Sequence, residues 1–107
     1  MKNPYFGRVL TAMVTPFAAA GSVNLEAAKQ VVDWWIAHGT DALVVTGSTG
    51  EAATMTIEEK KALWATVIKQ VNGRIPVIAG TGSNNTANSV ETTKIADELG
   101  MDGFLIV

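Results

Sequence analysis

Two hydroxyl residues, Ser48 and Thr49, stand between Gly47 and Gly50 where an apolar run ends, and the acid Glu51 follows them. Glycine has no side chain, so a ligand can approach the main chain closely on either side of the two hydroxyls. Main-chain N–H groups and hydroxyls together can hold a small anion without a cluster of basic side chains. We therefore treat this turn as a candidate anion-binding site, with an ordinary strand-to-helix turn as the alternative.

Two familiar phosphate-binding motifs are excluded at this turn and at the next glycine-rich segment. A P-loop requires G-x-x-x-x-G-K-[ST], and no lysine lies between residues 30 and 59. A dinucleotide fingerprint requires G-x-G-x-x-G, but Gly80-Thr81-Gly82 is followed by Asn85 at the position of the third glycine.

Other residue types that often carry chemistry are poorly placed. His38 is the single histidine. Without neighbouring acids it makes a poor metal site, so we expect neither a metal nor a cofactor. Glu58 and Glu59 begin a predicted helix, where acids serve capping and the helix dipole. The chain has no cysteine, which excludes disulfides and thiolate catalysis. None of the six lysines, at positions 2, 29, 60, 61, 69 and 94, falls on a predicted strand.

The elements that must position the turn alternate along the chain. Continuous apolar runs predict strands at residues 9–14, 42–46, 76–80 and 103–107. Such runs are typical of parallel strands buried on both faces of an α/β sheet. The carboxyl ends of parallel strands share one edge, so we expect "VTPF", "TGSTGE" and "AGTGSNNT" to lie together there.

Three amphipathic patterns between these runs predict helices. Asn24 is the predicted cap of the first helix, and Thr56 with Glu59 forms a capping box for the second. Asn85 or Thr86 caps the third, whose apolar residues include Val90. Trp34 and Trp35 point to different faces of the first helix, so only one of them can lie in the core.

Composition bounds the remaining possibilities. The 107 residues suffice for one domain, and 48% of them are hydrophobic, enough to build a core. A net charge of −2 without a basic cluster argues against nucleic acid or an anionic membrane as a partner. With no membrane-length apolar run and no signal peptide, we expect a soluble cytoplasmic protein. The final residues form an uncapped apolar strand, so the sequence looks cut, or a second copy covers that edge.

The stretches "GRVLTAMVTPF", "VVTGSTGEAATMT" and "GRIPVIAGTGSNNT" resemble the dihydrodipicolinate synthase family, in the same order and spacing, and the resemblance runs from Gly7 to Val107. It is specific for the superfamily of pyruvate-dependent Schiff-base aldolases. It implies an α/β fold, a (β/α)8 TIM barrel, of which residues 1–107 supply about the first four strands and three helices. The chain is then the N-terminal half of a single barrel domain.

The resemblance also implies a reaction, that of a lyase in lysine and diaminopimelate biosynthesis. A barrel lysine beyond Val107 forms a Schiff base with pyruvate, and the enamine then attacks aspartate semialdehyde. Thr49 matches the residue that holds the pyruvate carboxylate, and Ser48 matches a substrate-binding hydroxyl of a proton relay. The family usually has Thr at the position of Ser48. The relay tyrosines also lie beyond Val107, so the full-length enzyme, by resemblance a homotetramer, is active and this chain alone is not.

A regulatory site is implied as well. Many synthases of this family are inhibited by lysine at a subunit interface, and the matching positions are Ala52, Ala53, Ile57, Lys60, Gly82, Asn84 and Asn88. In lysine-sensitive relatives an acid stands where this chain has Asn88, and imidazoles stand where it has Ile57 and Lys60. The neutral Asn88 and the cationic Lys60 predict weak sensitivity to lysine.

Two other interpretations stay open at this point. The N-acetylneuraminate lyases share the G-S-T-G-E turn, so an aldolase with another aldehyde substrate is one alternative, although "AGTGSNNT" is more like the synthases. The other is a truncated, non-catalytic half barrel that persists by self-association.

Overall fold

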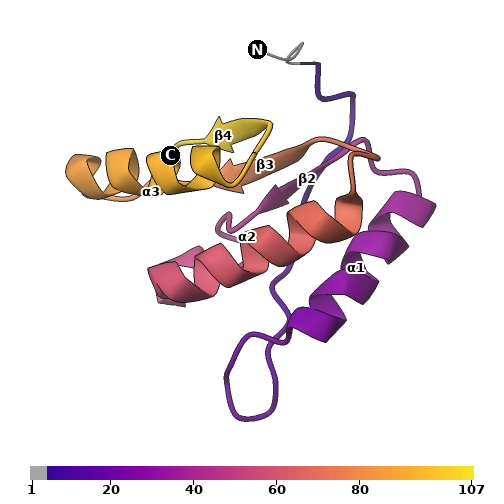
Figure 1. The fold of residues 1–107 in the computed structure, drawn as a ribbon, viewed down its shortest axis with the longest axis horizontal. Coiled ribbons are helices and arrows are strands. Elements are labelled where there is room, and N and C mark those ends of the chain that lie inside the picture. Colours follow the sequence, from indigo (N-terminus) through magenta and orange to yellow (C-terminus); the bar gives the residue numbers. More distant parts are fainter. Residues whose placement is uncertain (1–4) are drawn as a thin grey trace.

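A computed structural model of the chain describes residues 5–107 as an α/β fold in which strands and α-helices alternate (Figure 1). The strands are β1 (Leu10–Ala12), β2 (Ala42–Val45), β3 (Val77–Gly80) and β4 (Gly103–Leu105), and the helices are α1 (Leu25–Ala37), α2 (Ile57–Val71) and α3 (Thr86–Glu98). The strands form one parallel sheet in the order β1-β2-β3-β4. The predicted α/β class is therefore confirmed, with each helix returning the chain to the start of the next strand.

The helix starts follow the capping residues of the sequence. Asn24 Oδ1 accepts a hydrogen bond from the main-chain N–H of Ala27 at 3.0 Å. Thr56 and Glu59 form the predicted reciprocal capping box, at 3.1 and 2.8 Å. Of the two candidates for α3, Asn85 is the N-cap.

The inner and outer strands differ in length and burial. All residues of β2 and β3 are buried, as predicted for inner parallel strands. β1 and β4 are shorter than the predicted ranges 9–14 and 103–107, and Leu10 and Leu105 remain 41% and 44% exposed. The prediction of strands buried on both faces is wrong for these two, because each has only one neighbouring strand within residues 5–107.

The main core lies between the sheet and the helices. Leu43 and Val45 of β2 point to this side, where they pack with Trp64 of α2 and Val32 of α1. Figure 1 shows α1 and α2 side by side, which agrees with their extensive contacts. On the opposite face of the sheet, a smaller cluster centred on Val44 packs against Phe6.

Some large apolar side chains of the helices lie outside the core. Trp35 packs against the core, whereas Trp34 is 53% exposed and stacks on the His38 ring, with the ring centroids 3.9 Å apart. Val90, one of the apolar residues of the predicted third helix, is 47% exposed on α3, whereas Ala96 is buried. Within residues 5–107, the helices are too short or too polar to cross a membrane.

Candidate functional site at the carboxyl edge of the sheet

Three loops that follow successive strands meet at the carboxyl edge of the sheet, as the sequence predicts. Thr15, after β1, donates its hydroxyl to the carbonyl of Gly50 at 2.7 Å. Thr46, directly after β2, places its Oγ1 3.0 Å from the carbonyl oxygen of Gly80, the last residue of β3. Both threonines are buried, so these two contacts join the strand ends without using the exposed hydroxyls.

The turn over residues 47–50 presents unused donors. Its frame is set by hydrogen bonds from Gly50 N–H to Gly47 O at 3.1 Å and from Glu51 N–H to Ser48 O at 3.0 Å. Ser48 and Thr49 are exposed, and neither their hydroxyls nor their main-chain N–H groups hydrogen-bond to any atom of residues 5–107. Two N–H groups and two hydroxyls on one turn are donors that can bind a small carboxylate.

Thr46 holds the backbone conformation from which this turn starts. Its φ is +57°, in the left-handed region that β-branched residues rarely enter. Such a conformation costs on the order of 1–3 kcal/mol and persists when surrounding contacts hold it. The contacts here are made by Oγ1, which lies 2.6 Å from Val45 O and 3.0 Å from Gly80 O and accepts from Trp64 Nε1 at 3.0 Å.

Neighbouring parts of the chain approach two glycines of this edge closely, and at Gly80 they leave no room for a side chain. A Cβ atom on Gly80 would lie 2.3 Å from the carbonyl oxygen of Thr46. A Cβ on Gly50 would lie 3.1 Å from both Met13 O and Thr15 Oγ1. The backbone at Gly80 is therefore packed directly on the backbone at Thr46, without a side chain between them.

A cavity of about 610 Å³ opens at this edge, between the loops that follow β2 and β3. Its lining brings together Ser48 and six of the seven residues assigned above to the regulatory site: Ala52, Ala53, Lys60, Gly82, Asn84 and Asn88. The seventh, Ile57, and the predicted carboxylate-binding Thr49 are not among the lining residues. Lys60 forms no ion pair with the residues that the structure describes, so its ammonium group is available to a ligand.

The two carboxyl groups with shifted pKa values lie away from this cavity. Hydrogen bonds from the main-chain N–H groups of Val9 and Arg8, both 2.8 Å long, lower the pKa of Asp41. Hydrogen bonds from Arg74 and Gln70 lower the pKa of Asp33. These groups stabilise connections between elements and face no part of the candidate site.

The positions of the remaining candidate residues agree with the sequence analysis. The lysines described by the structure lie on α1, α2 and α3, and Lys2 lies outside residues 5–107. His38 caps α1, with Nδ1 2.7 Å from Trp34 O.

Three features of the site were not predicted from the sequence. They are the short 3₁₀-helix η1 (Ala52–Thr54) and the buried hydrogen bonds of Thr15 and Thr46. A three-residue helix has no periodicity to detect. The polar Thr46 at the end of an apolar run was the one available signal for its bond.

Comparison with known proteins relates this arrangement to a family. The model of the dihydrodipicolinate synthetase family matches residues 5–107. The 4-hydroxy-tetrahydrodipicolinate synthase 1 of Halalkalibacterium halodurans is 56% identical over 101 residues, which make up 94% of this chain and 34% of that protein. The Bacillus subtilis 4-hydroxy-tetrahydrodipicolinate synthase is 51% identical over 102 residues, 95% of this chain and 35% of that protein. The chain thus spans about a third of the length of the curated relatives it matches.

Solved structures of similar proteins have the same arrangement of elements. A dihydrodipicolinate synthase from Bacillus anthracis matches with a TM-score of 0.93 and 48% identity, over 95% of this chain and 35% of that one. The chloride-inhibited synthase of Acinetobacter baumannii complexed with pyruvate matches with a TM-score of 0.93 and 39% identity over the same shares. A synthase from Cyanidioschyzon merolae with lysine bound matches with a TM-score of 0.91 and 44% identity, over 94% of this chain and 35% of that one.

Proposed function

The chain belongs to the dihydrodipicolinate synthetase family, and from this premise we propose that residues 1–107 form the N-terminal half of a single barrel domain of a 4-hydroxy-tetrahydrodipicolinate synthase. The proposed reaction condenses pyruvate with aspartate semialdehyde in lysine and diaminopimelate biosynthesis. The observation that carries the proposal is the turn over residues 47–50, whose two N–H groups and two hydroxyls have no partner within residues 5–107.

In this proposal the turn holds the carboxylate of pyruvate. Thr49 donates its hydroxyl and main-chain N–H to the carboxylate oxygens, as charge-assisted hydrogen bonds. A lysine outside this segment attacks the keto carbon, and loss of water gives the Schiff base. Binding the carboxylate with neutral donors places no second cation beside that lysine.

Ser48 serves the proton transfers that follow. Loss of a methyl proton from the Schiff base gives an enamine, whose carbon attacks the aldehyde carbon of aspartate semialdehyde. The new alkoxide then needs a proton, and a hydroxyl can pass one on because it is both donor and acceptor. Ser48 is exposed and lines the cavity, so its hydroxyl is accessible to such a relay.

We assign a second role, that of an effector site, to the six residues that line the cavity together with Ser48. A similar synthase solved with lysine bound supports lysine as a ligand within the family. Lys60 lines the cavity without an ion-pair partner among the described residues, and Asn88 supplies no negative charge. Glu51 is the acidic side chain of the lining, but Lys60 and Asn88 disfavour a cationic lysine side chain at their own positions. We therefore propose that the enzyme is weakly sensitive or insensitive to lysine.

We further propose that the enzyme is a cytoplasmic homotetramer. The family membership supports this assembly.

The test is covalent trapping of pyruvate. We would join residues 1–107 to the C-terminal two thirds of the Bacillus subtilis relative, giving a full-length barrel chimera, and treat it with pyruvate and borohydride. Mass spectrometry should find one reduced adduct, on a lysine outside residues 1–107. The 107-residue chain alone should gain none, because its described lysines lie on helices. A folded chimera without an adduct, or an adduct on the isolated chain, would contradict the proposal.

A further inference from the structure

The geometry points to Thr46 and Trp64 as a positioning pair that holds the turn over residues 47–50 in its anion-binding orientation. Neither residue lies on that turn, and neither is needed to touch pyruvate. The inference rests on the proposed pyruvate site and adds two residues that determine how well it is formed.

The Thr46 hydroxyl links three elements at one buried point. It accepts from the indole Nε1–H of Trp64 on α2 at 3.0 Å. Its single proton can go to Gly80 O on β3, at 3.0 Å, or to Val45 O on β2, at 2.6 Å. The residue is 2% exposed, so water does not substitute for these partners.

The buried indole N–H of Trp64 in turn needs the Thr46 hydroxyl as its hydrogen-bond acceptor. It is the largest fully buried side chain of the described residues, and its indole N–H is its one polar group. A buried N–H without an acceptor is costly, so the hydroxyl of Thr46 fixes the ring and the ring fixes the hydroxyl. An apolar side chain could fill the same space without a hydrogen bond. We therefore assign the bond between Trp64 and Thr46 a role beyond filling the core.

The role of this hydrogen bond follows from the position of Thr46 directly before the turn. Its φ of +57° turns the chain away from the strand direction, and residues 47–50 begin at the next peptide. If the backbone of Thr46 relaxed to an extended conformation, the N–H groups of Ser48 and Thr49 would point elsewhere. On the other side, the Thr46 carbonyl packs directly on Gly80, where a Cβ would approach it to 2.3 Å. The hydrogen bond between Trp64 and Thr46 and the close packing of Gly80 therefore both hold the strained backbone of Thr46.

The test compares pyruvate kinetics of single variants in the barrel chimera. Thr46→Val removes the hydroxyl at nearly constant shape and should raise the pyruvate KM about tenfold, with kcat changed much less, because a misplaced carboxylate site weakens ground and transition states equally. Thr46→Ser retains a hydroxyl at this position, so its pyruvate KM should be close to that of the unsubstituted chimera. In a Trp64→Phe background, Thr46→Val should cost less, since no indole N–H is then left unpaired. Thr66→Val removes an exposed hydroxyl of the same helix and should leave KM unchanged.

Each outcome decides the inference. A pyruvate KM that is unchanged in Thr46→Val, or that Thr46→Ser fails to restore, would overturn it. If the unsubstituted chimera traps no pyruvate, that result counts against the proposed function instead. The pair is then judged from a crystal structure of Thr46→Val, in which a displaced turn supports the inference and an unmoved turn overturns it.

Discussion

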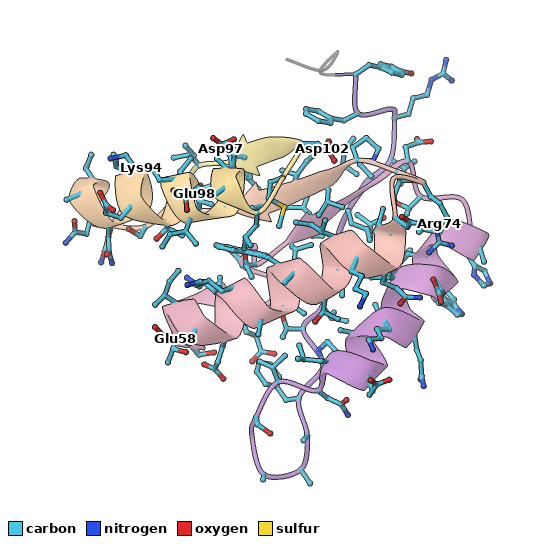
Figure 2. All side chains as sticks on the ribbon, in the orientation of Figure 1. Glu58, Arg74, Lys94, Asp97, Glu98 and Asp102 are labelled. Atoms are coloured by element: carbon cyan, nitrogen blue, oxygen red, sulfur yellow. The ribbon has the colours of Figure 1, made fainter. Side chains whose placement is uncertain are left out.

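The polar groups at the two edges of the parallel sheet differ in whether they have hydrogen-bond partners within residues 5–107. At the amino edge, Asp41 accepts a hydrogen bond from the main-chain N–H of Val9, just before β1, and Asp102 accepts one from Val77, the first residue of β3. Each aspartate also donates its own N–H to the carbonyl of the same residue. At the carboxyl edge, the donors of Ser48 and Thr49 have no partner within residues 5–107. Figure 2 shows Asp102 and Arg74 toward the amino edge, with Glu58 at the other end of α2.

This difference separates groups that hold the fold from groups that can bind a ligand. A polar group that already has its partner contributes to stability and has little left to offer a substrate. The amino edge repeats one solution, because Gly39-Thr40-Asp41 and Gly100-Met101-Asp102 both place an aspartate directly before a strand. At the carboxyl edge, the unpaired donors lie on a turn that is held in place by hydrogen bonds of the buried Thr15 and Thr46.

The largest expected effect comes from removing one unpaired donor. Thr49→Val in the barrel chimera should weaken pyruvate capture by about 1.5–3 kcal/mol, the usual loss of a hydrogen bond to a charged group. That loss corresponds to a roughly 10- to 100-fold change in pyruvate affinity. The melting temperature should hardly change, because Thr49 is exposed and makes no hydrogen bond within residues 5–107. Steady-state kinetics and a thermal melt measure both quantities.

The matched variant at the other edge is Asp41→Asn, which should show the opposite pattern. The neutral amide accepts more weakly from the two N–H groups of Arg8 and Val9, so the melting temperature should fall. The pyruvate KM should not change. If both variants altered stability and affinity together, the functional separation of the two edges would be wrong.

A smaller effect is expected at the cavity. Asn88→Glu adds a carboxylate that can pair with an ammonium, so it should increase lysine inhibition of the chimera about tenfold or more. Asn88→Gln is the control for side-chain length and should leave inhibition weak. Half-inhibition of the unsubstituted chimera by submillimolar lysine would contradict the assignment.

The smallest effect is the response of stability to acid. Because hydrogen bonds lower the folded-state pKa of Asp41 and Asp33, their stabilising contribution is fully present above about pH 5 and is lost as the pH falls through the lowered values. Asp33 is exposed and Asp41 is partly exposed, so solvent screening keeps the contribution small. Asp41→Asn should flatten the fall of the melting temperature below about pH 4, and an unchanged slope would show that Asp41 does not contribute.

The repeating elements were predictable from the sequence, because each has a local cause. Asn24, Thr56 and Glu59 cap helices within a few residues of themselves, and the apolar runs at 42–46 and 76–80 carry the inner strands. The site was predictable as a turn with two hydroxyls. The bond between Trp64 and Thr46 was not, because it joins residues on different elements, and a polar residue at the end of an apolar run does not indicate which residue it bonds. The exposure of Val90 also depends on which face of α3 meets its neighbours.

A crystal structure of the barrel chimera with pyruvate trapped by borohydride would show directly where the pyruvate carboxylate binds. We expect the carboxylate to lie on the turn over residues 47–50, with its oxygens about 2.7–3.2 Å from Thr49 Oγ1 and from the main-chain N–H groups. A trapped carboxylate bound elsewhere in the barrel, with Ser48 and Thr49 still facing solvent, would contradict it.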